Sequence, residues 1–281
     1  MNGIFAGIDI GSSMTKVVIL NNGIIVSIVR TSGAEHRKLA NKVMEEALRQ
    51  AKLNLTDITF IVATGYGRVN VPFADKQITE ISCHARGISN FLFTARTVVD
   101  IGGQDSKVIT LLNGKVKDFT MNDRCAAGTG RFLEVTAESI GVTLEELNQL
   151  ALQSETKVSI SNTCTVFAAQ EIASQLAEGA SLKDIAAGIF DAIVTRTYNL
   201  MQKLKVEKDT VITGGGAKNV ALMKTLENKI GYPVFTPPDP FLTGAIGAAL
   251  LGKELSEHTG EDDLSFKKKN RHLEEATFYY F

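Results

Sequence analysis

The chain has 281 residues, of which 44% are hydrophobic and 22% charged, and its formal net charge is -1 at pH 7. This near-neutral charge gives no reason to expect nucleic acid or an anionic membrane as a partner, and no stretch approaches the roughly 18 apolar residues of a membrane-spanning helix. The N-terminus lacks the basic segment of a signal peptide, and there are three cysteines. We therefore expect a protein of the reducing cytoplasm.

The first element that the sequence predicts is a β-hairpin with a tight loop. An apolar strand over 4–8 ends at an acid, and small residues then lead into a second strand that reaches Asn22-Gly23, a strong hairpin signal. Such a loop presents backbone N–H groups to a phosphate, and the acid can bind Mg²⁺, usually through water. The candidates are Asp9 for Mg²⁺, Gly11, Ser12 and Ser13 for phosphate, and Lys16 for phosphate charge, with a solvated edge-strand lysine as the alternative for Lys16.

Helical patterns follow over residues 39–53 and 76–90. Between them, Tyr66 and Arg68 lie in a glycine-flanked loop, which is either an ordinary turn or a contact with the other lobe or a partner. Cys83 and His84 fall on the second helix among apolar residues at helical spacing. Core packing is the expected role for this pair.

The N-terminal pattern then returns. Asp100-Ile-Gly-Gly-Gln-Asp-Ser-Lys107 keeps the acid, the glycine, the hydroxyl residue and the lysine in the places they have in Asp9-Ile-Gly-Ser-Ser-Met-Thr-Lys16. Two matched loops that face each other are expected to bind one triphosphate; strand-terminating turns are the alternative. The candidates here are Asp100 for Mg²⁺ or as the base, Gly102 and Gly103 for phosphate, and Gln104 to orient the attacking water, whereas Lys107 is expected to be a solvated lysine.

Two cysteines precede predicted helices. Cys125 leads into a helix over 131–140 and Cys164 into one over 168–176, so both thiols are expected where a helix begins. A helix N-terminus favours the thiolate, and its N–H groups would stabilise an iron-sulfur cluster. Two cysteines are too few for the usual four-thiolate cluster, but two identical chains supply four. The alternative is that both are small buried residues.

A third glycine cluster follows a short strand over 210–213 and opens a helical pattern over 217–230. A glycine turn from strand into helix lets a ligand approach the backbone at the helix N-terminus. The fingerprints of the dinucleotide fold and of the P-loop are both absent. Gly214, Gly215 and Gly216 are therefore the candidate floor of an adenosine site, and Gly128 and Gly130 are further candidate N–H donors near the nucleotide.

In order, these segments resemble the phosphate-1, phosphate-2 and adenosine motifs of the actin, Hsp70 and sugar-kinase ATPase superfamily, over residues 1 to about 252. The resemblance implies an α/β fold, in which two duplicated lobes with mixed sheets flanked by helices bind ATP or ADP with Mg²⁺ in the cleft between them. The repeat places the first lobe at 1–95 and the second, with both cysteines, at 96–236. A helix over about 240–251 has a small-residue face and is expected to return to the first lobe.

Four longer motifs are more specific. Residues 63–68, 81–85, 122–134 and 161–167 look closely like the activator component of 2-hydroxyacyl-CoA dehydratases, a family that includes the ATP-binding subunits of benzoyl-CoA reductase and the reductases of double-cubane proteins. The resemblance implies a homodimer with one bridging 4Fe-4S cluster, held by Cys125 and Cys164 of each chain. Ferredoxin or flavodoxin would reduce it, and ATP hydrolysis would drive one electron at very low potential onto a dehydratase, an aryl-CoA reductase or a double-cubane protein.

Two other classes of function stay open, because the fold alone fixes no substrate. A small-molecule, sugar-type kinase would use the same ATP loops without a cluster, and a non-redox ATP switch would need no cluster either. The charge-rich tail over 252–281 departs from the family pattern. We expect a solvated terminus there, with an aromatic end over 278–281 that docks on a subunit or partner as the alternative.

Overall fold

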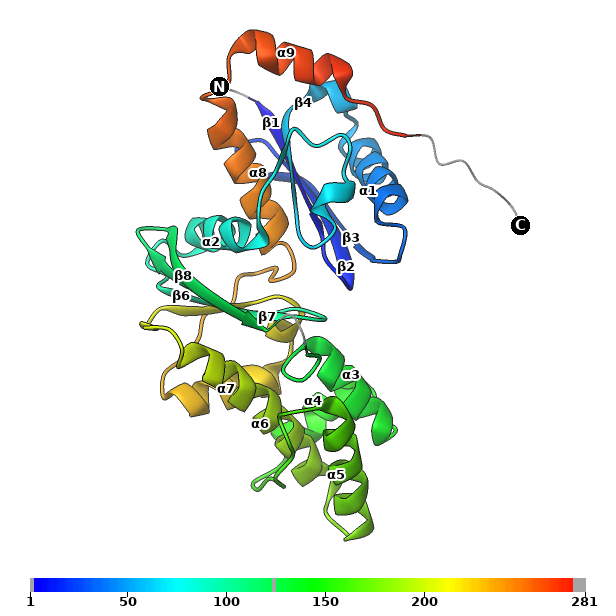
Figure 1. Ribbon diagram of the computed structural model, residues 1–281, viewed down its shortest axis with the longest axis vertical. Helices are drawn as coiled ribbons and strands as arrows, with labels where there is room; N and C mark the ends of the chain where they lie inside the picture. The colour runs from blue at the N-terminus through cyan, green and yellow to red at the C-terminus, as the bar shows by residue number, and fades with distance from the viewer. Residues whose placement is uncertain (1–2, 123–124, 275–281) are drawn as a thin grey trace, which may run out of the picture. The chain divides into compact units, whose positions relative to one another are not determined.

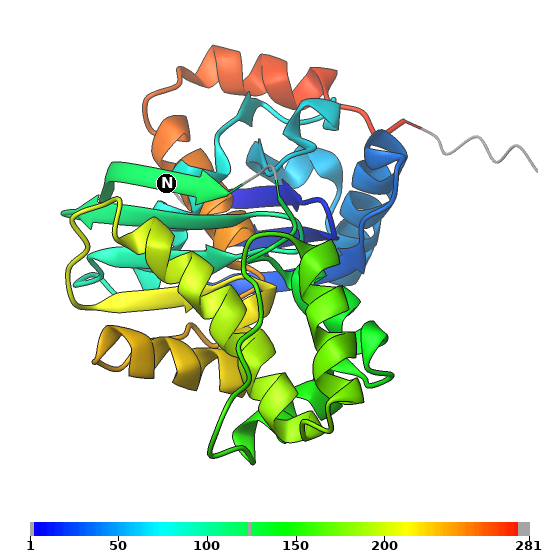
Figure 2. The same ribbon diagram turned by 60° about the horizontal axis from the view of Figure 1, so that its bottom comes forward.

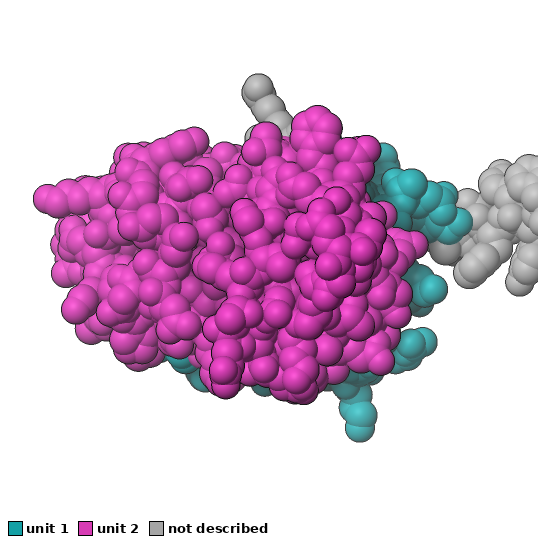
Figure 3. Space-filling model, turned by 90° about the horizontal axis from the view of Figure 1, so that it is seen from below, with its two compact units in different colours: residues 1–93, 241–281 teal, residues 94–240 magenta. Residues whose placement is uncertain are grey.

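The computed structural model describes residues 3–122 and 125–274. The chain forms two compact units, shown in teal and magenta in Figure 3. Unit 1 consists of two parts of the chain, the part that ends at Phe93 and the part that begins at Phe241. Unit 2 is Thr94–Pro240. The chain therefore passes between the units twice.

Unit 1 is built on a mixed five-stranded sheet in the order β3-β2-β1-β4-β5. The first three strands form an antiparallel meander, and β4 and β5 run parallel to β1. One helix packs on one face of this sheet, whereas a second covers the other face and carries a third helix on its outer side (Figure 1). These elements are β1 (Ile4–Ile10), β2 (Met14–Leu20), β3 (Ile24–Thr31), α1 (His36–Ala51), β4 (Ile58–Thr64), β5 (Lys76–Gln77), α2 (Glu80–Phe91) and α8 (Thr243–Ser256), with short 3-10 turns at Leu55–Asp57 and Arg68–Asn70.

The two faces of this sheet are filled by alternate residues of each strand, as the period of two requires. Ile8 and Ile10 of β1 join the core beneath α1, and Phe5 joins the core beneath α8. The predicted small-residue face of the helix over 240–251 is confirmed. A Cβ atom on Gly7 would lie 1.9 Å from the Ala245 carbonyl oxygen, so the backbones of β1 and α8 approach closely.

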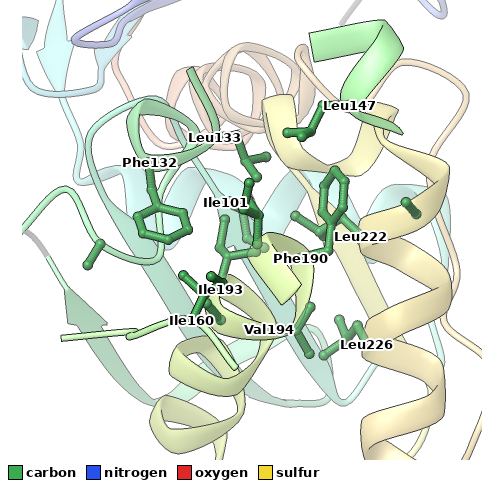
Figure 4. Packing of buried hydrophobic residues seen from close by; sticks show 14 of the residues in the cluster. Ile101, Phe132, Leu133, Leu147, Ile160, Phe190, Ile193, Val194, Leu222 and Leu226 are labelled. Atoms are coloured by element: carbon green, nitrogen blue, oxygen red, sulfur yellow. The ribbon is translucent and has the colours of Figure 1, made fainter. Parts of the chain in front are cut away.

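Unit 2 holds a second mixed sheet, in the order β8-β7-β6-β9. Its helices lie on one side of this sheet (Figures 1 and 2), and a cluster of aliphatic and aromatic side chains fills the space between them (Figure 4). The elements are β6 (Thr97–Ile101), β7 (Ser106–Leu112), β8 (Lys115–Asn122), α3 (Gly130–Ser139), α4 (Leu144–Leu152), α5 (Thr165–Ala177), α6 (Leu182–Met201), β9 (Thr210–Thr213), a 3-10 turn at Gly215–Lys218, and α7 (Val220–Ile230).

The predicted helices over 39–53, 131–140 and 168–176 are confirmed to within a few residues, but two others begin late. Lys76–Gln77 pair with β4 as a short strand, and the Thr79 hydroxyl oxygen then accepts the N–H of Ser82 to cap α2. In the same way the Asn219 side chain caps α7, after the glycine turn has formed a 3-10 segment. Side-chain caps, rather than the apolar period, set these two starts.

The expectation of a solvated terminus is wrong for the described part of the tail. Residues Glu261–Asn270 form a further helix, α9, whose Leu264 is buried in the core beside α8. Arg271 follows it and forms an ion pair with Asp75 that is 3% exposed on both sides. The sequence did not predict that this segment packs on unit 1. Its residues are mostly charged, and a single buried ion pair leaves no periodic pattern in the sequence. The aromatic end over 278–281 lies outside the described residues.

Candidate functional site

The first predicted phosphate loop is the turn between β1 and β2. Asp9 and Lys16 are paired across the two strands, and the Gly11 N–H donates to the Met14 carbonyl oxygen at 3.1 Å, which closes a tight loop between them. The Lys16 ammonium donates to Asp9 Oδ2 at 3.1 Å. Asp9 is buried, whereas Gly11, Ser12, Ser13 and Lys16 are partly exposed. The loop therefore presents its backbone at the surface of unit 1, above a buried carboxylate.

The turn between β6 and β7 in unit 2 has the same construction. Asp100 is paired with Lys107 across the strands, and the Gly102 N–H donates to the Asp105 carbonyl oxygen at 2.9 Å. Gly102 and Gly103 are partly exposed and Gln104 is exposed. The structure thus forms both predicted loops with one geometry, each within its own unit.

The two lysines differ in their surroundings. The expectation that Lys107 is solvated is wrong, because its side chain is 2% exposed and its ammonium lies 3.1 Å from Asp100 and 2.8 Å from Asp105. Lys16 is 13% exposed and pairs with Asp9. Asp105 was not singled out from the sequence, although it stands where the first copy has Met14. Among the positions at which the two copies differ, this one, with Met14 in the first copy and Asp105 in the second, was the available signal.

Because of this difference, we expect Lys107→Met to lower stability more than Lys16→Met. Lys107→Met leaves two carboxylates without their buried partner and should lower the free energy of unfolding by about 3–5 kcal/mol. Lys16→Met strands one carboxylate, at a cost of about 1–3 kcal/mol, and should mainly weaken ATP binding. Denaturant unfolding and nucleotide titration of both variants check this. Equal losses of stability would contradict the assigned difference.

The repeat extends beyond the hairpins to the strand beside each. Asp9 is aligned with Thr64 of β4, and Asp100 with Thr213 of β9, both in parallel pairs. A glycine with positive φ follows each threonine, at +85° in Gly65 and +78° in Gly214. A Cβ atom on Gly65 would lie 2.4 Å from Asp9 Oδ1, and one on Gly214 would lie 2.6 Å from Asp100 Oδ1. A side chain at either position would displace the carboxylate.

This extension gives the loop over 65–67 a structural counterpart in the glycine cluster over 214–216. Gly67 packs on Ile10 as Gly216 packs on Ile101. Tyr66 therefore stands where unit 2 has Gly215, and its side chain is 78% exposed. The sequence signal for this extension of the repeat was the Thr-Gly pair that ends β4 and recurs at the end of β9.

Gly128, in the turn before α3, and Gly130, the first residue of α3, both lie next to the second predicted phosphate loop. The Gly130 N–H donates to the Gly102 carbonyl oxygen and the Arg131 N–H to that of Gly103, both at 2.8 Å. The Gly128 carbonyl oxygen accepts the hydroxyl of Ser106. The N-terminus of α3 thus holds the phosphate loop of unit 2 by two backbone hydrogen bonds.

Cys125 and Cys164 lie in neighbouring loops of unit 2. The Cys125 thiol donates to the carbonyl oxygen of Thr163, with Sγ and O 3.7 Å apart, and Thr163 directly precedes Cys164. Both cysteines are free and partly exposed. The Asn122 amide fixes the Cys125 loop by donating to the carbonyl oxygens of Cys125 and Ala127, each at 2.9 Å. The structure therefore brings both predicted ligands to one place.

Only one of these thiols begins a helix. Cys164 is the N-cap of α5, whereas Cys125 lies five residues ahead of α3, whose N-cap is Thr129. The expectation is therefore confirmed for Cys164 and wrong for Cys125, because the glycine-rich turn between Cys125 and α3 separates this thiol from the helix. Asp123 and Arg124 of the same motif lie outside the described residues.

Within the described residues, no group of three or more His, Cys, Asp or Glu side chains is placed to hold a metal ion. Cys83 is fully buried on α2, which confirms core packing for this residue. Burial raises the pKa of the Cys83 thiol to about 12, against a smaller opposing effect of the neighbouring Thr64 hydroxyl. Thiol chemistry at neutral pH is therefore closed to Cys83.

In the described parts of the chain, no helix is both long enough and apolar enough to cross a bilayer.

Known proteins resemble this chain over most of its length. The chain is 45% identical, over 259 residues, to the 2-hydroxyisocaproyl-CoA dehydratase activator of Clostridioides difficile, covering 91% of this chain and 97% of the relative. Two solved structures superpose closely. The dehydratase component A for (R)-2-hydroxyglutaryl-CoA from Acidaminococcus fermentans has a TM-score of 0.86 at 40% identity, covering 91% of this chain and 99% of its own.

The second structure is the activator of 2-hydroxyisocaproyl-CoA dehydratase from Clostridium difficile with bound ADPNP, with a TM-score of 0.84 at 42% identity over 91% of this chain and 96% of its own. The chain has the actin-like ATPase fold of these neighbours. The model of the BadF/BadG/BcrA/BcrD ATPase family matches residues 6–252, which include both hairpin loops, both partly exposed cysteines and the glycine cluster. The chain belongs to the BadF/BadG/BcrA/BcrD ATPase family.

Proposed function

We propose that this protein is an ATP-dependent reductive activator. As a homodimer with one bridging 4Fe-4S cluster, it would couple ATP binding and hydrolysis to the transfer of one electron, at very low potential, onto a partner iron-sulfur enzyme. The relatives named as dehydratase activators suggest a 2-hydroxyacyl-CoA dehydratase as that partner, with an aryl-CoA reductase or a double-cubane protein as the other acceptors. Ferredoxin or flavodoxin would supply the electron in the cytoplasm.

The observation that carries this proposal is the juxtaposition of Cys125 and Cys164. Two free, partly exposed thiols in adjacent loops suit a shared cluster, because each chain then supplies two of four thiolates. The Cys164 side chain makes no capping hydrogen bond to α5. The hydroxyl of the neighbouring Thr165 is buried and has no hydrogen-bond partner among the described residues. The residues present therefore fit a sulfide-bearing ligand at this place.

The cluster would supply one-electron chemistry, at a potential set by charge, hydrogen bonds and exposure. The chain's own contribution is mechanical. Cys164 begins α5, and the Arg196 guanidinium of α6 donates to the Asn162 carbonyl oxygen in the same loop at 2.9 Å. Gly128, in the turn between Cys125 and α3, packs against the Arg196 side chain. A shift of the phosphate loop would therefore reach both cysteine loops through Arg196 and the N-terminus of α3.

The nucleotide roles follow from the two hairpins and are part of the same proposal. Positioning and electrostatics dominate phosphoryl transfer, and Mg²⁺ prefers carboxylate and water oxygens. The buried, lysine-paired carboxylates of Asp9 and Asp100 fit that ion. We assign Asp9 and Asp100 to Mg²⁺ through water, Gly11, Ser12, Ser13, Gly102 and Gly103 to phosphate, Lys16 to phosphate charge, Gln104 or Asp100 to the attacking water, Gly214, Gly215 and Gly216 to adenosine, and Gly128 and Gly130 to support of the second loop.

Redox titration with and without nucleotide tests the proposal. Anaerobically purified protein should show a one-electron transition whose midpoint potential differs between the ADP-bound state and the state with a non-hydrolysable ATP analogue. The physical reason is that nucleotide binding can shift a redox equilibrium only through a difference in affinity for its two states. A sugar-type kinase or a non-redox ATP switch would show no such transition, and Mg²⁺-dependent phosphorylation of a small molecule by the iron-free protein would favour the kinase.

A further inference from the structure

The Asp9 carboxylate lies at the junction of β1 with α2 and α8, and both of its oxygens have close neighbours. Oδ1 faces the backbone of Gly65, where a Cβ atom would come within 2.4 Å. Oδ2 accepts from the Lys16 ammonium at 3.1 Å. Oδ2 also lies 3.0 Å from the position that a Cβ atom on Gly244 would occupy, in the first turn of α8. The carboxylate therefore has neighbours on three sides, namely Lys16 of β2, Gly65 after β4 and Gly244 of α8.

His84 of α2 reaches the same place. Its ring is buried, and its Nδ1 atom lies 2.9 Å from the hydroxyl oxygen of Thr243, the first residue of α8. Its Nε2 atom lies 3.4 Å from the same Cβ position on Gly244 that is 3.0 Å from Asp9 Oδ2. Placing a polar ring in a core costs free energy unless its atoms have polar partners. One ring nitrogen therefore contacts α8, and the other lies near the same point beside Gly244 as the carboxylate does.

The frame around His84 is rigid, because α2 and α8 approach backbone to backbone. A Cβ atom on Gly87 would lie 2.2 Å from the Thr243 carbonyl oxygen, and one on Gly247 would lie 1.7 Å from that of Cys83. The chain also leaves unit 1 just after α2 and re-enters it just before α8. His84 therefore links the two helices of unit 1 that adjoin the segments through which the chain passes between the units.

We propose that His84 is a positioning residue, whose Nε2 side holds the Asp9 carboxylate in the orientation that binds Mg²⁺. This inference rests on the proposed function, since it takes Asp9 to bind Mg²⁺ through water. Groups that orient a metal ligand typically change metal affinity by about 10–100-fold when they are replaced. If His84 only packed in the core, replacing its Nε2 atom would leave Mg²⁺ binding unchanged. A test must therefore distinguish core packing from positioning of the Asp9 carboxylate.

Two substitutions separate the two nitrogens. His84→Asn keeps a polar atom near the Nδ1 position, facing Thr243, and removes the Nε2 side, whereas His84→Gln places its amide near the Nε2 position. Binding of a fluorescent ADP is measured in excess EDTA and then across a Mg²⁺ titration. We expect His84→Asn to raise the Mg²⁺ concentration at half-maximal effect by about tenfold, with ADP affinity in EDTA and melting temperature close to wild type. His84→Gln should restore most of the Mg²⁺ response.

Gly244→Ala gives an independent probe, because its methyl group would enter between the carboxylate and the ring. It should reproduce the weakened Mg²⁺ response, and His258→Asn at an exposed histidine of the same unit should change nothing. The inference is overturned if both His84 variants melt early and lose ADP affinity equally with and without Mg²⁺, or if His84→Asn responds to Mg²⁺ as wild type does. Wild type that binds nucleotide with no Mg²⁺ dependence would instead remove the nucleotide roles of the proposed function.

Discussion

Asp9→Asn is expected to reduce ATP hydrolysis by more than about 100-fold, since groups that merely orient a metal ligand are worth about 10–100-fold. The substitution keeps the shape of the side chain but removes the charge that Mg²⁺ requires. Asp9 is 4% exposed, so bulk water offers little compensation. Initial rates of phosphate release at saturating Mg-ATP measure the effect. Asp100→Asn should behave alike, because its carboxylate has the same lysine and glycine neighbours.

The matched control is Asp262→Asn, an exposed acid on α9 far along the chain from either loop. Its rate should equal that of wild type. If Asp9→Asn and Asp100→Asn both hydrolysed ATP at the wild-type rate, the two carboxylates would not serve Mg²⁺, and the functional reading of the repeat would be wrong even though its geometry stands.

Arg271→Met should lower the free energy of unfolding by about 3–5 kcal/mol, the usual cost of breaking a buried ion pair from one side. The Arg271 guanidinium donates to the Asp75 carboxylate, with Nε and Oδ1 2.9 Å apart, and to the carbonyl oxygens of Ile58 at 2.7 Å and Thr59 at 3.1 Å. Its loss strands three acceptors beside β4. Denaturant unfolding of the variant measures the cost.

The pH dependence of this defect has a definite sign. Burial raises the pKa of Asp75 above its ordinary value, and Arg271 acts against this rise. Removing Arg271 raises the folded-state pKa further, so protonation at falling pH stabilises the folded variant more than the folded wild type. The stability difference should therefore shrink as the pH is lowered. Arg37→Met is the control. Arg37 of α1 is exposed and pairs with Glu274, which lies in the same C-terminal segment as Arg271. A defect equal to that control would mean that the Asp75 pair adds nothing.

The sequence predicted those features that a repeated pattern encodes. The hairpins at Asp9 and Asp100, the glycine turn at Gly214 and the helix after Cys164 all rest on strand period, turn residues or helix formers, and the structure has each of them. The family also followed from motifs at fixed spacing. Such local elements can be predicted from a single sequence because each signal lies within a few residues.

Two of the features that were missed depend on contacts between distant segments. Lys107 is different, because its partners Asp105 and Asp100 lie in the same hairpin, and it was misjudged because β7 is an inner strand rather than an edge strand. Arg271 lies 196 positions from its partner Asp75, and His84 lies 159 from Thr243. Burial of a charge or an imidazole requires a partner, and partner positions are set by the packing of α8 and α9 on the sheet. No pattern along the chain reports that packing.

The most direct test of the proposed function is the content of iron and acid-labile sulfide per chain in anaerobically purified protein. Wild type should hold about two irons and two sulfides per chain, which is one four-iron cluster per dimer. Cys125→Ser and Cys164→Ser should lose this iron, whereas Cys83→Ser should keep it, because Cys83 is buried away from the surface. Wild type that holds no iron after reconstitution, or variants that keep the full wild-type content, would contradict the account of an electron-transferring ATPase.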